Sequence, residues 1–251
     1  SGVFVGEGIV DSCNTTTLPM EAKYPNLTIL KNKSIRALMT QMRKVTTSTP
    51  EFRFNANRVH KILVEEGYCQ LPAKEVDIQT PCGTYCGVEY PTNFCAVSIM
   101  RSGDSLLQAF IEAFPDAPIG KVLIQRDEST PDKRARFYYS KLPKDIENMF
   151  VFICDPMLAT GGSVCEVIRL LKERNIPEER IIFLNVISAP QGIERVFAAY
   201  PNIQIVTCAL DEGLNEDKYI VPVCFLRFLN GRVLVTTVIA SLIHWVRVVF
   251  S

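Results

Sequence analysis

One short stretch of the chain combines a carboxylate, hydroxyls and paired glycines in an order that suits a phosphate ester. An apolar run at 149–154 ends at Asp155, and a loop of small residues follows before apolar residues recur at helical spacing. Strand, loop and helix in this order present free backbone N–H groups at a helix N-terminus, where the dipole favours an anion. Gly161 and Gly162 permit positive φ and close approach of a ligand. We therefore predict a phosphate-binding loop, with Asp155 facing the molecule that carries the phosphate.

The predicted loop is built from small, apolar and hydroxyl-bearing residues. It comprises Asp155, Pro156, Met157, Leu158, Ala159, Thr160, Gly161, Gly162 and Ser163. The hydroxyls of Thr160 and Ser163 are further donors to a phosphate. The simpler alternative is an ordinary turn in which Ser163 is the helix N-cap. No Gly-Lys-Ser or Gly-Lys-Thr follows, so the loop is not of the Walker type.

Two arginines follow apolar segments that have the character of strands. Arg101 comes after the run at 95–100, and Arg126 comes after the run at 121–125. In open α/β sheets ligands bind beyond the carboxyl ends of the strands, so Arg101 is well placed to meet an anion. A surface ion pair is the alternative for Arg101. Arg126 opens a charged stretch at 126–136, which predicts a long hairpin that is either a functional lid or an exposed linker.

Short apolar runs alternate with amphipathic segments along most of the chain. The runs lie at 95–100, 121–125, 149–154, 180–187 and 203–210. Their alternation with helical patterns predicts an α/β fold with a doubly wound parallel sheet.

An N-terminal helical segment and a hairpin precede these runs. A short strand is expected at 26–30, and a basic helix follows over about 31–44. Its apolar face consists of Ile35, Leu38, Met39 and Met42. A second helix is expected over 51–66, with Phe54 on its apolar side and His60 as a surface or packing residue. Turn residues at 74–91 predict a protruding β-hairpin.

Composition excludes several classes of partner. The chain has 251 residues with 27 Lys+Arg and 27 Asp+Glu, so no net field favours nucleic acid or an anionic membrane. The nine cysteines form no Cys-x-x-Cys pair, and Cys95, Cys154 and Cys208 lie in apolar runs, as expected of reduced core thiols in a cytoplasmic protein. The only histidines, His60 and His244, are far apart in sequence, so no metal site is expected.

Several segments together resemble uracil phosphoribosyltransferases, which are type I phosphoribosyltransferases. They lie at 97–103, 119–128, 155–163, 189–197 and 219–222. The resemblance spans roughly 27–222 and is greatest to eukaryotic or protozoan members. It implies the type I phosphoribosyltransferase fold and a reaction of pyrimidine salvage. In that reaction 5-phosphoribosyl-1-diphosphate (PRPP) and uracil give UMP and diphosphate.

The resemblance also implies roles for individual residues. Residues matching Arg101 and Arg126 bind PRPP, the segment matching 155–163 holds its ribose and 5-phosphate, and Arg126 and Asp155 are the expected catalytic residues. Tyr219 and Ile220 match part of the uracil site. Magnesium would arrive on the diphosphate of PRPP. Family members form homodimers or homotetramers, and some respond to GTP, for which the basic segment at 31–44 is the candidate site; a solvated helix face is its alternative.

The chain departs from the family pattern after Pro222. The family continues with a Gly-x-Gly-Asp-like run that binds uracil, whereas Phe225 and Leu226 stand at the positions of the glycine and the aspartate. Leu226 has no hydrogen-bond acceptor in its side chain. Two alternatives to uracil transfer follow: a catalytically impaired PRPP- or nucleotide-binding protein, and a transferase for another base.

Three regions are expected along the chain. They are a flexible polar arm at 1–25, the phosphoribosyltransferase domain at 26–222 and an atypical apolar tail at 223–251. The uncharged run at 233–246 is short for a membrane span, and Arg232 and Arg247 flank it closely. The tail is interpreted either as the product of an altered reading frame or retained intron, or as a docking segment.

Overall fold

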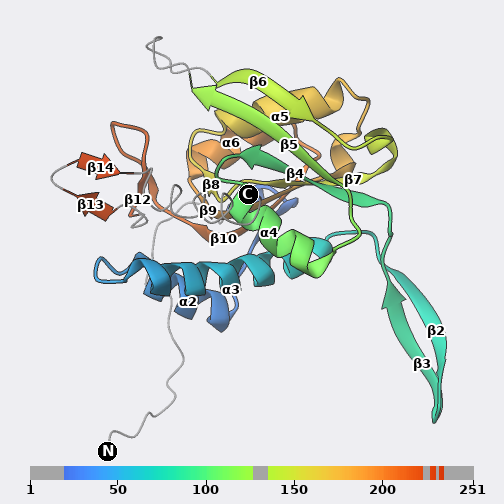
Figure 1. The fold of residues 1–251 in the computed structure, drawn as a ribbon. Coiled ribbons are helices and arrows are strands. Elements are labelled where there is room, and N and C mark those ends of the chain that lie inside the picture. Colours follow the sequence, from blue (N-terminus) through green and yellow to red (C-terminus); the bar gives the residue numbers. More distant parts are fainter. Residues whose placement is uncertain (1–19, 127–134, 223–226, 230–231, 235–251) are drawn as a thin grey trace, which may run out of the picture.

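The fold is a mostly parallel sheet with helices on both faces, as the alternation of elements predicts (Figure 1). The computed structural model describes residues 20–126, 135–222, 227–229 and 232–234. The eight-stranded sheet has the order β1-β10-β9-β7-β4-β5-β6, with β8 paired to β9 beside this path. Only the β5/β6 pair is antiparallel. The strands are β1 (Leu27–Ile29), β4 (Phe94–Met100), β5 (Ile119–Arg126), β6 (Ala135–Lys141), β7 (Phe150–Cys154), β8 (Met157–Leu158), β9 (Ile181–Ser188) and β10 (Gln204–Leu210).

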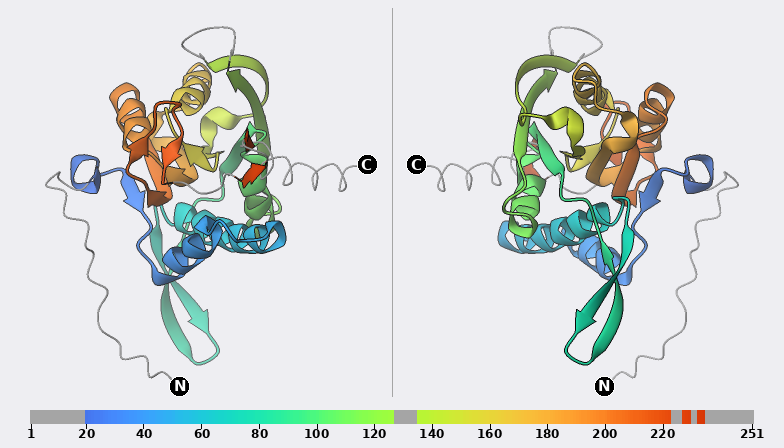
Figure 2. Two further views of the ribbon diagram at one scale, coloured as in Figure 1. Left: turned by 90° about the vertical axis from the view of Figure 1, so that its left-hand side faces the viewer. Right: turned by 90° about the vertical axis from the view of Figure 1, so that its right-hand side faces the viewer.

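The central strands are continuously apolar because both faces of the sheet are covered. The helices α2 (Lys33–Arg43), α3 (Thr49–Tyr68) and α4 (Asp104–Ala113) cover one face, and α5 (Gly162–Lys172) and α6 (Pro190–Ala199) cover the other (Figures 1 and 2). Neighbouring strand residues accordingly enter different cores: Ala96 packs with the first set of helices, and Val97 packs with the second. Two short 3-10 helices lie at Ile146–Asn148 and Glu178–Arg180.

The N-terminal helices follow the sequence pattern closely, with one exception at Phe54. All four predicted apolar residues of α2 are buried. In α3, however, Phe54 is 65% exposed, because Ala56, Val59 and Leu63 form the face that meets the core. His60 is a packing residue and not a surface residue, since it lies buried on that same face.

The expected flexible arm at 1–25 is ordered in its last part. A helical turn, α1 (Met20–Lys23), precedes Tyr24, whose ring stacks on Phe197 of α6 with a centroid distance of 4.6 Å. Lys23 also pairs with Glu194 of α6 at 2.8 Å. These contacts tie residues 20–24 to the domain, and residues 1–19 lie outside the described chain.

Two hairpins were expected, and both are present. β2 (Lys74–Thr80) and β3 (Gly83–Glu89) form the first, which extends away from the domain (Figures 1 and 2). β5 and β6 form the second, and their connection at 127–134 lies outside the described residues.

Two further pairs are small and antiparallel. They join β11 (Gly213–Leu214) to β12 (Ile220–Val221), and β13 (Arg227–Leu229) to β14 (Arg232–Leu234). Apart from β13 and β14, the predicted tail at 223–251 is not described. Among the helices that are described, none has the length and apolar character needed to cross a bilayer.

Candidate active site

The predicted phosphate loop connects β7 to α5 at the carboxyl edge of the sheet. Asp155 follows the last residue of β7 and is almost fully buried, and residues 157–164 complete the lining of a hollow of about 60 Å³. Helix α5 begins at Gly162, with Gly161 as its N-cap and no side chain capping it by a hydrogen bond. The alternative with Ser163 as N-cap is therefore wrong. Residues of the first turn of α5, whose N–H groups have no acceptor within the helix, line this hollow, as an anion site requires.

Glycines let the loop fit tightly against its neighbours. Gly161 has a φ of 75°, so the expected positive φ is confirmed there, whereas Gly162 begins the helix and does not adopt it. Gly192, at the start of α6, lies against the phosphate loop, and the sequence did not reveal this contact. A Cβ on Gly192 would lie 2.5 Å from the carbonyl oxygen of Ala159 and 3.0 Å from that of Leu158. The loop is thus held by close backbone packing against α6.

Arg101 lies beside the phosphate loop because its strand, β4, pairs with β7. Arg101 is exposed and directly follows β4, and Ser102 donates a hydrogen bond from Oγ to Oδ1 of Asp155 at 2.7 Å. A Cβ on Gly103 would lie 2.1 Å from the carbonyl oxygen of Cys154, so this turn packs directly on the end of β7. Sequence reasoning missed Ser102, although a hydroxyl next to Arg101 was a signal for it.

Arg126 is the last residue of β5, which runs parallel to β4. The ends of the adjacent strands β5, β4 and β7 therefore bring the backbone of Arg126, Arg101 and Asp155 to one edge of the sheet. The side chain of Arg126 lies outside the described part of the structure.

Tyr219 and Ile220 lie beyond β10, on a loop closed by the β11/β12 pair. Tyr219 is half-buried, and its backbone N–H donates to Oδ1 of Asn215 at 2.8 Å. The side chain of Ile220 is buried in the core that contains the α2 side chains, so it does not face a ligand. Any contact of Ile220 with a base would be made by its backbone. The departures at Phe225 and Leu226 lie outside the described residues.

The buried cysteine thiols of the sheet are structural. Burial raises the pKa of the Cys95 thiol to about 12, and burial likewise raises the pKa of Cys154 and of Cys208. All three thiols are free and buried, as expected of core cysteines. Within residues 20–126, 135–222 and the two short tail strands, no group of three or more His, Cys, Asp or Glu side chains is arranged to hold a metal ion.

Comparison with known proteins agrees with this geometry. Residues 29–224 match the sequence profile of uracil phosphoribosyltransferase. The chain is also 42% identical to the uracil phosphoribosyltransferase of Dictyostelium discoideum over 202 residues, which cover 79% of this chain and 93% of that protein. The chain belongs to the uracil phosphoribosyltransferase family. All site residues predicted for this family member, from Arg101 to Ile220, lie inside the matched region.

Two further similarities extend the comparison. The uracil phosphoribosyltransferase of Saccharomyces cerevisiae is 42% identical over 193 residues, which cover 76% of this chain and 88% of that enzyme. Among solved structures, the AQ2163 protein of Aquifex aeolicus superposes with a TM-score of 0.68 at 27% identity, covering 79% of this chain and 93% of that one. The type I phosphoribosyltransferase fold and the eukaryotic likeness expected from the sequence are both confirmed.

Proposed function

We propose that this protein transfers the phosphoribosyl group of PRPP to uracil, releasing diphosphate and forming UMP for pyrimidine salvage. The observation that carries the proposal is the phosphate loop at 155–163, which joins an almost buried carboxylate to an uncapped helix N-terminus. The bond from C1 of the ribose to diphosphate breaks, and diphosphate leaves with its electron pair. A uracil nitrogen forms the new bond to C1 and loses its proton. Such catalysis depends on positioning and on stabilisation of developing charge.

Each part of the site has a role in this reaction. The backbone N–H groups and hydroxyls of the loop bind the 5-phosphate, and Asp155 accepts hydrogen bonds from the ribose and opposes the positive charge that develops on it. Arg101 and Arg126 bind diphosphate oxygens with planar donor pairs. The β5/β6 hairpin that carries Arg126 shields the reacting centre from water.

The residues of the site fit magnesium that arrives bound to the diphosphate of PRPP. It prefers one or two carboxylates together with substrate phosphates over a cage built only of protein ligands. A single carboxylate after β7, with Arg101 after β4 and Arg126 at the end of β5 to bind diphosphate oxygens, suits a magnesium diphosphate. When bound, the ion neutralises charge on the leaving group.

The uracil site is proposed at the loop that carries Tyr219 and Ile220, with recognition through backbone groups. Phe225 and Leu226 stand where the family has glycine and aspartate, and this difference motivates two alternative functions. One is a protein that binds PRPP or nucleotides without turnover, and the other is a transferase for another base. The comparisons give no support to the impaired protein, since the relatives from Dictyostelium discoideum and Saccharomyces cerevisiae are named uracil phosphoribosyltransferase.

The deciding experiment measures conversion of labelled uracil to UMP by the purified chain with PRPP and magnesium. Equal amounts of UMP and diphosphate are expected, and an Asp155→Asn variant should lose most of the rate. Calorimetry separates the rivals: PRPP binding with neither uracil binding nor UMP formation would replace the transferase by a binding protein. The same assay with a panel of other bases tests the alternative of a transferase for another base.

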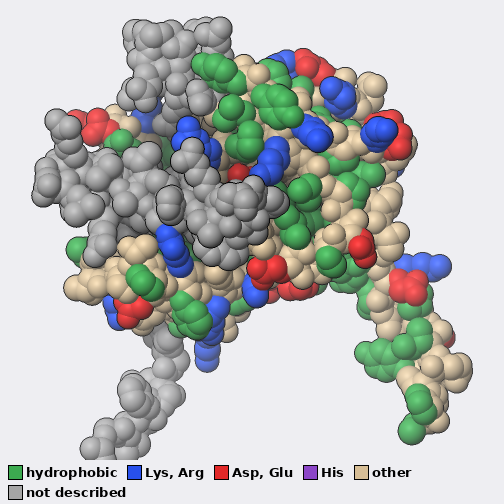
Figure 3. Space-filling view, viewed as in Figure 1, with side chains coloured by type: hydrophobic (Ala, Val, Ile, Leu, Met, Phe, Trp, Pro, Cys, Tyr) green, Lys and Arg blue, Asp and Glu red, His purple; other side chains and the backbone are tan. Residues whose placement is uncertain are grey.

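Self-association is proposed as a homodimer or homotetramer. The β2/β3 hairpin exposes Ile78 and Tyr85, which pair across one of its faces, and hydrophobic side chains are visible along it in Figure 3. An isolated two-stranded hairpin is only marginally stable in water, so contact with a second copy would support it. Light scattering of the intact chain and of an Ile78→Asp/Tyr85→Asp variant tests this, because the variant should be monomeric.

A nucleotide effector such as GTP is proposed for the basic segment. A pocket of about 490 Å³ lies between α2 and the ends of β1 and β10, and Lys31, Arg36 and Arg43 are among its lining residues. If added GTP changes neither the rate nor the oligomer size, GTP is not an effector of this protein.

The free thiols of the described residues suit a reducing compartment, and we propose that the protein is located in the cytoplasm.

A further inference from the structure

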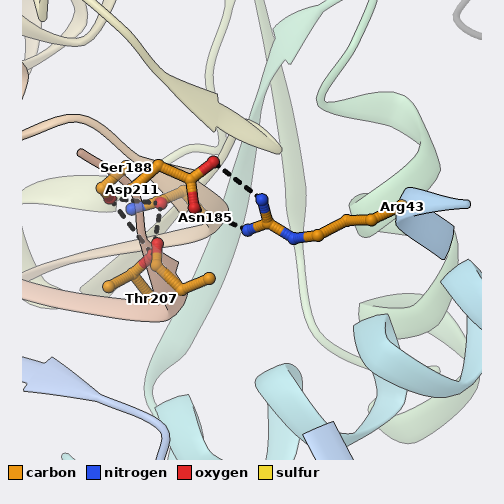
Figure 4. A network of polar contacts seen from close by, with 6 residues as sticks. Arg43, Asn185, Ser188, Thr207 and Asp211 are labelled. Carbon is orange, nitrogen blue, oxygen red and sulfur yellow. Dashed lines mark hydrogen bonds and ion pairs between the residues drawn. The ribbon is translucent and has the colours of Figure 1, made fainter. Parts of the chain in front are cut away.

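Arg43 and Asp211 form a two-pronged ion pair between the helical layer and the loop that carries Tyr219. Nη1 of Arg43 donates to Oδ2 of Asp211 at 2.9 Å, and Nη2 donates to Oδ1 at 2.6 Å (Figure 4). Arg43 is the last residue of α2, and Asp211 directly follows β10. The side chain of Asp211 is only 5% exposed and that of Arg43 is 23% exposed, so the pair is largely shielded from solvent.

The Tyr219 loop leaves the sheet at Asp211 and returns beside Glu212, the next residue. The N–H of Asp211 donates to the carbonyl of Ser188 at 2.9 Å, and the N–H of Glu212 donates to the carbonyl of Val221 at 3.1 Å. Leu214 then pairs with Ile220 in the β11/β12 pair. Anchoring Asp211 therefore anchors both ends of the loop.

The end of β9 supports this loop and the phosphate loop together. Leu158 of the phosphate loop pairs with Ser188, and its carbonyl accepts the N–H of Ala189 at 2.8 Å. Ser188 thus contacts the phosphate loop through Leu158 and the Tyr219 loop through Asp211. Movement of Asp211 relative to Ser188 would change the distance between the two substrate sites.

A buried polar cluster lies beneath this junction. Oδ1 of Asn185 accepts the Ser188 hydroxyl at 2.7 Å and the Thr207 hydroxyl at 2.8 Å, and all three side chains are fully buried (Figure 4). The cluster holds the ends of β9 and β10 in register. It fixes the backbone before Asp211 but leaves the direction of the Tyr219 loop to the ion pair with Arg43.

We propose that Arg43 and Asp211 are a positioning pair for the acceptor base. The pair fixes the Tyr219 loop on α2, and thereby sets the base at bonding distance from the ribose held by the phosphate loop. This inference rests on the proposed function. Neither residue is required to touch either substrate, so the pair acts through the loop and PRPP binding does not depend on it.

The test compares Arg43→Gln and Asp211→Asn with the double variant, all without added nucleotide because both residues also line the effector pocket. Each single variant should raise the KM for uracil by about tenfold or more, as small displacements of a reacting group do. The Kd for PRPP should stay within about twofold of the parent value, since the phosphate loop is held separately. The double variant should be little worse than either single one, and Arg43→Lys should recover part of the loss.

Lys61→Gln is the matched control. It removes a 2.9 Å ion pair with Glu112, which joins α3 to α4 away from both loops. This variant should leave the KM for uracil unchanged. If the Arg43 and Asp211 variants instead raise the KM for uracil and the Kd for PRPP together, in proportion to a lowered Tm, the pair is only a stabilising contact and the inference is wrong.

Amide hydrogen exchange gives a readout that does not depend on turnover. In Arg43→Gln, peptides covering residues 211–222 should exchange faster, whereas those covering 155–163 should not change. If the parent chain forms no UMP, the proposed function fails, and exchange alone then decides the inference. Unchanged exchange at 211–222 would overturn it.

Discussion

Ser102 donates a 2.7 Å hydrogen bond to Asp155, and so links the turn that carries Arg101 to the first residue of the phosphate loop. The two residues follow neighbouring parallel strands, β4 and β7. The link holds the carboxylate in one direction and couples the proposed diphosphate contact to the proposed ribose contact. Charge-assisted hydrogen bonds of this kind are shorter and stronger than neutral ones.

Removal of this hydrogen bond should slow catalysis without unfolding the domain. We expect Ser102→Ala to lower kcat/KM for PRPP about tenfold, since a hydrogen bond to a charged group contributes about 1.5–3 kcal/mol. Steady-state kinetics with varied PRPP measure it. Thr80→Ala, which removes a hydroxyl contact to the Gly83 carbonyl in the distant hairpin, is the control and should leave kcat/KM unchanged. Equal losses in both variants would contradict a role for Ser102 in orienting Asp155.

Gly192 should be as important for PRPP binding as the glycines of the loop itself. In Gly192→Ala the new Cβ would meet the carbonyl oxygens of Ala159 and Leu158 at 2.5 and 3.0 Å, so the loop must move. We expect the Kd for PRPP to rise about tenfold or more, measured by calorimetry.

Gly87→Ala is the control for this experiment. Its Cβ would lie 3.3 Å from the Tyr85 ring, which can shift, and 3.9 Å from the carbonyl oxygen of Val76, which is an ordinary contact distance. PRPP affinity should stay at the parent value in this variant. An unchanged Kd for PRPP in Gly192→Ala would show that the loop adapts to the new methyl group. It would contradict the role of close packing against Gly192 in PRPP binding.

The sequence predicted what depends on local patterns and left out what depends on tertiary contacts. The strands, the two long N-terminal helices and the phosphate loop follow from short-range periodicity and from small residues in one segment. Ser102, Gly192 and the Arg43–Asp211 pair were missed because each acts across the sheet or between layers. Arg43 and Asp211 are 168 positions apart, and no local pattern links them. The prediction that Phe54 lies on the apolar side of its helix was wrong for a related reason. Only tertiary packing decides which face of α3 is buried.

The cysteines should separate into two classes of reactivity. Cys69, Cys82 and Cys86 are exposed and should be alkylated by iodoacetamide in the native protein. Cys154 and Cys208 are buried and burial raises their pKa, so they should react only after unfolding. Peptide mass spectrometry before and after denaturation measures each site. Alkylation of Cys154 in the native protein at a rate similar to that of Cys82 would contradict the burial of Cys154 at the end of β7.

His60 should make the domain less stable in mild acid. Burial lowers the pKa of His60 from 6.5 to about 4, although a hydrogen bond with the Ser105 backbone partly opposes this. The folded state therefore keeps His60 neutral while the unfolded chain takes up a proton below pH 6.5. The stabilising effect is fully present above pH 6.5 and is lost as pH falls toward 4, with a loss of about 2 kcal/mol by pH 5.

Urea unfolding between pH 7.5 and pH 5 measures this loss, and His60→Leu isolates it. Leucine cannot bind a proton and can occupy the buried position on α3, so the variant should lose less unfolding free energy over the same pH range. The acidic residues are the same in both proteins, so the difference between the two pH profiles reports on His60. Parallel pH profiles for the parent and His60→Leu would show that His60 is protonated as readily in the folded state as in the unfolded chain.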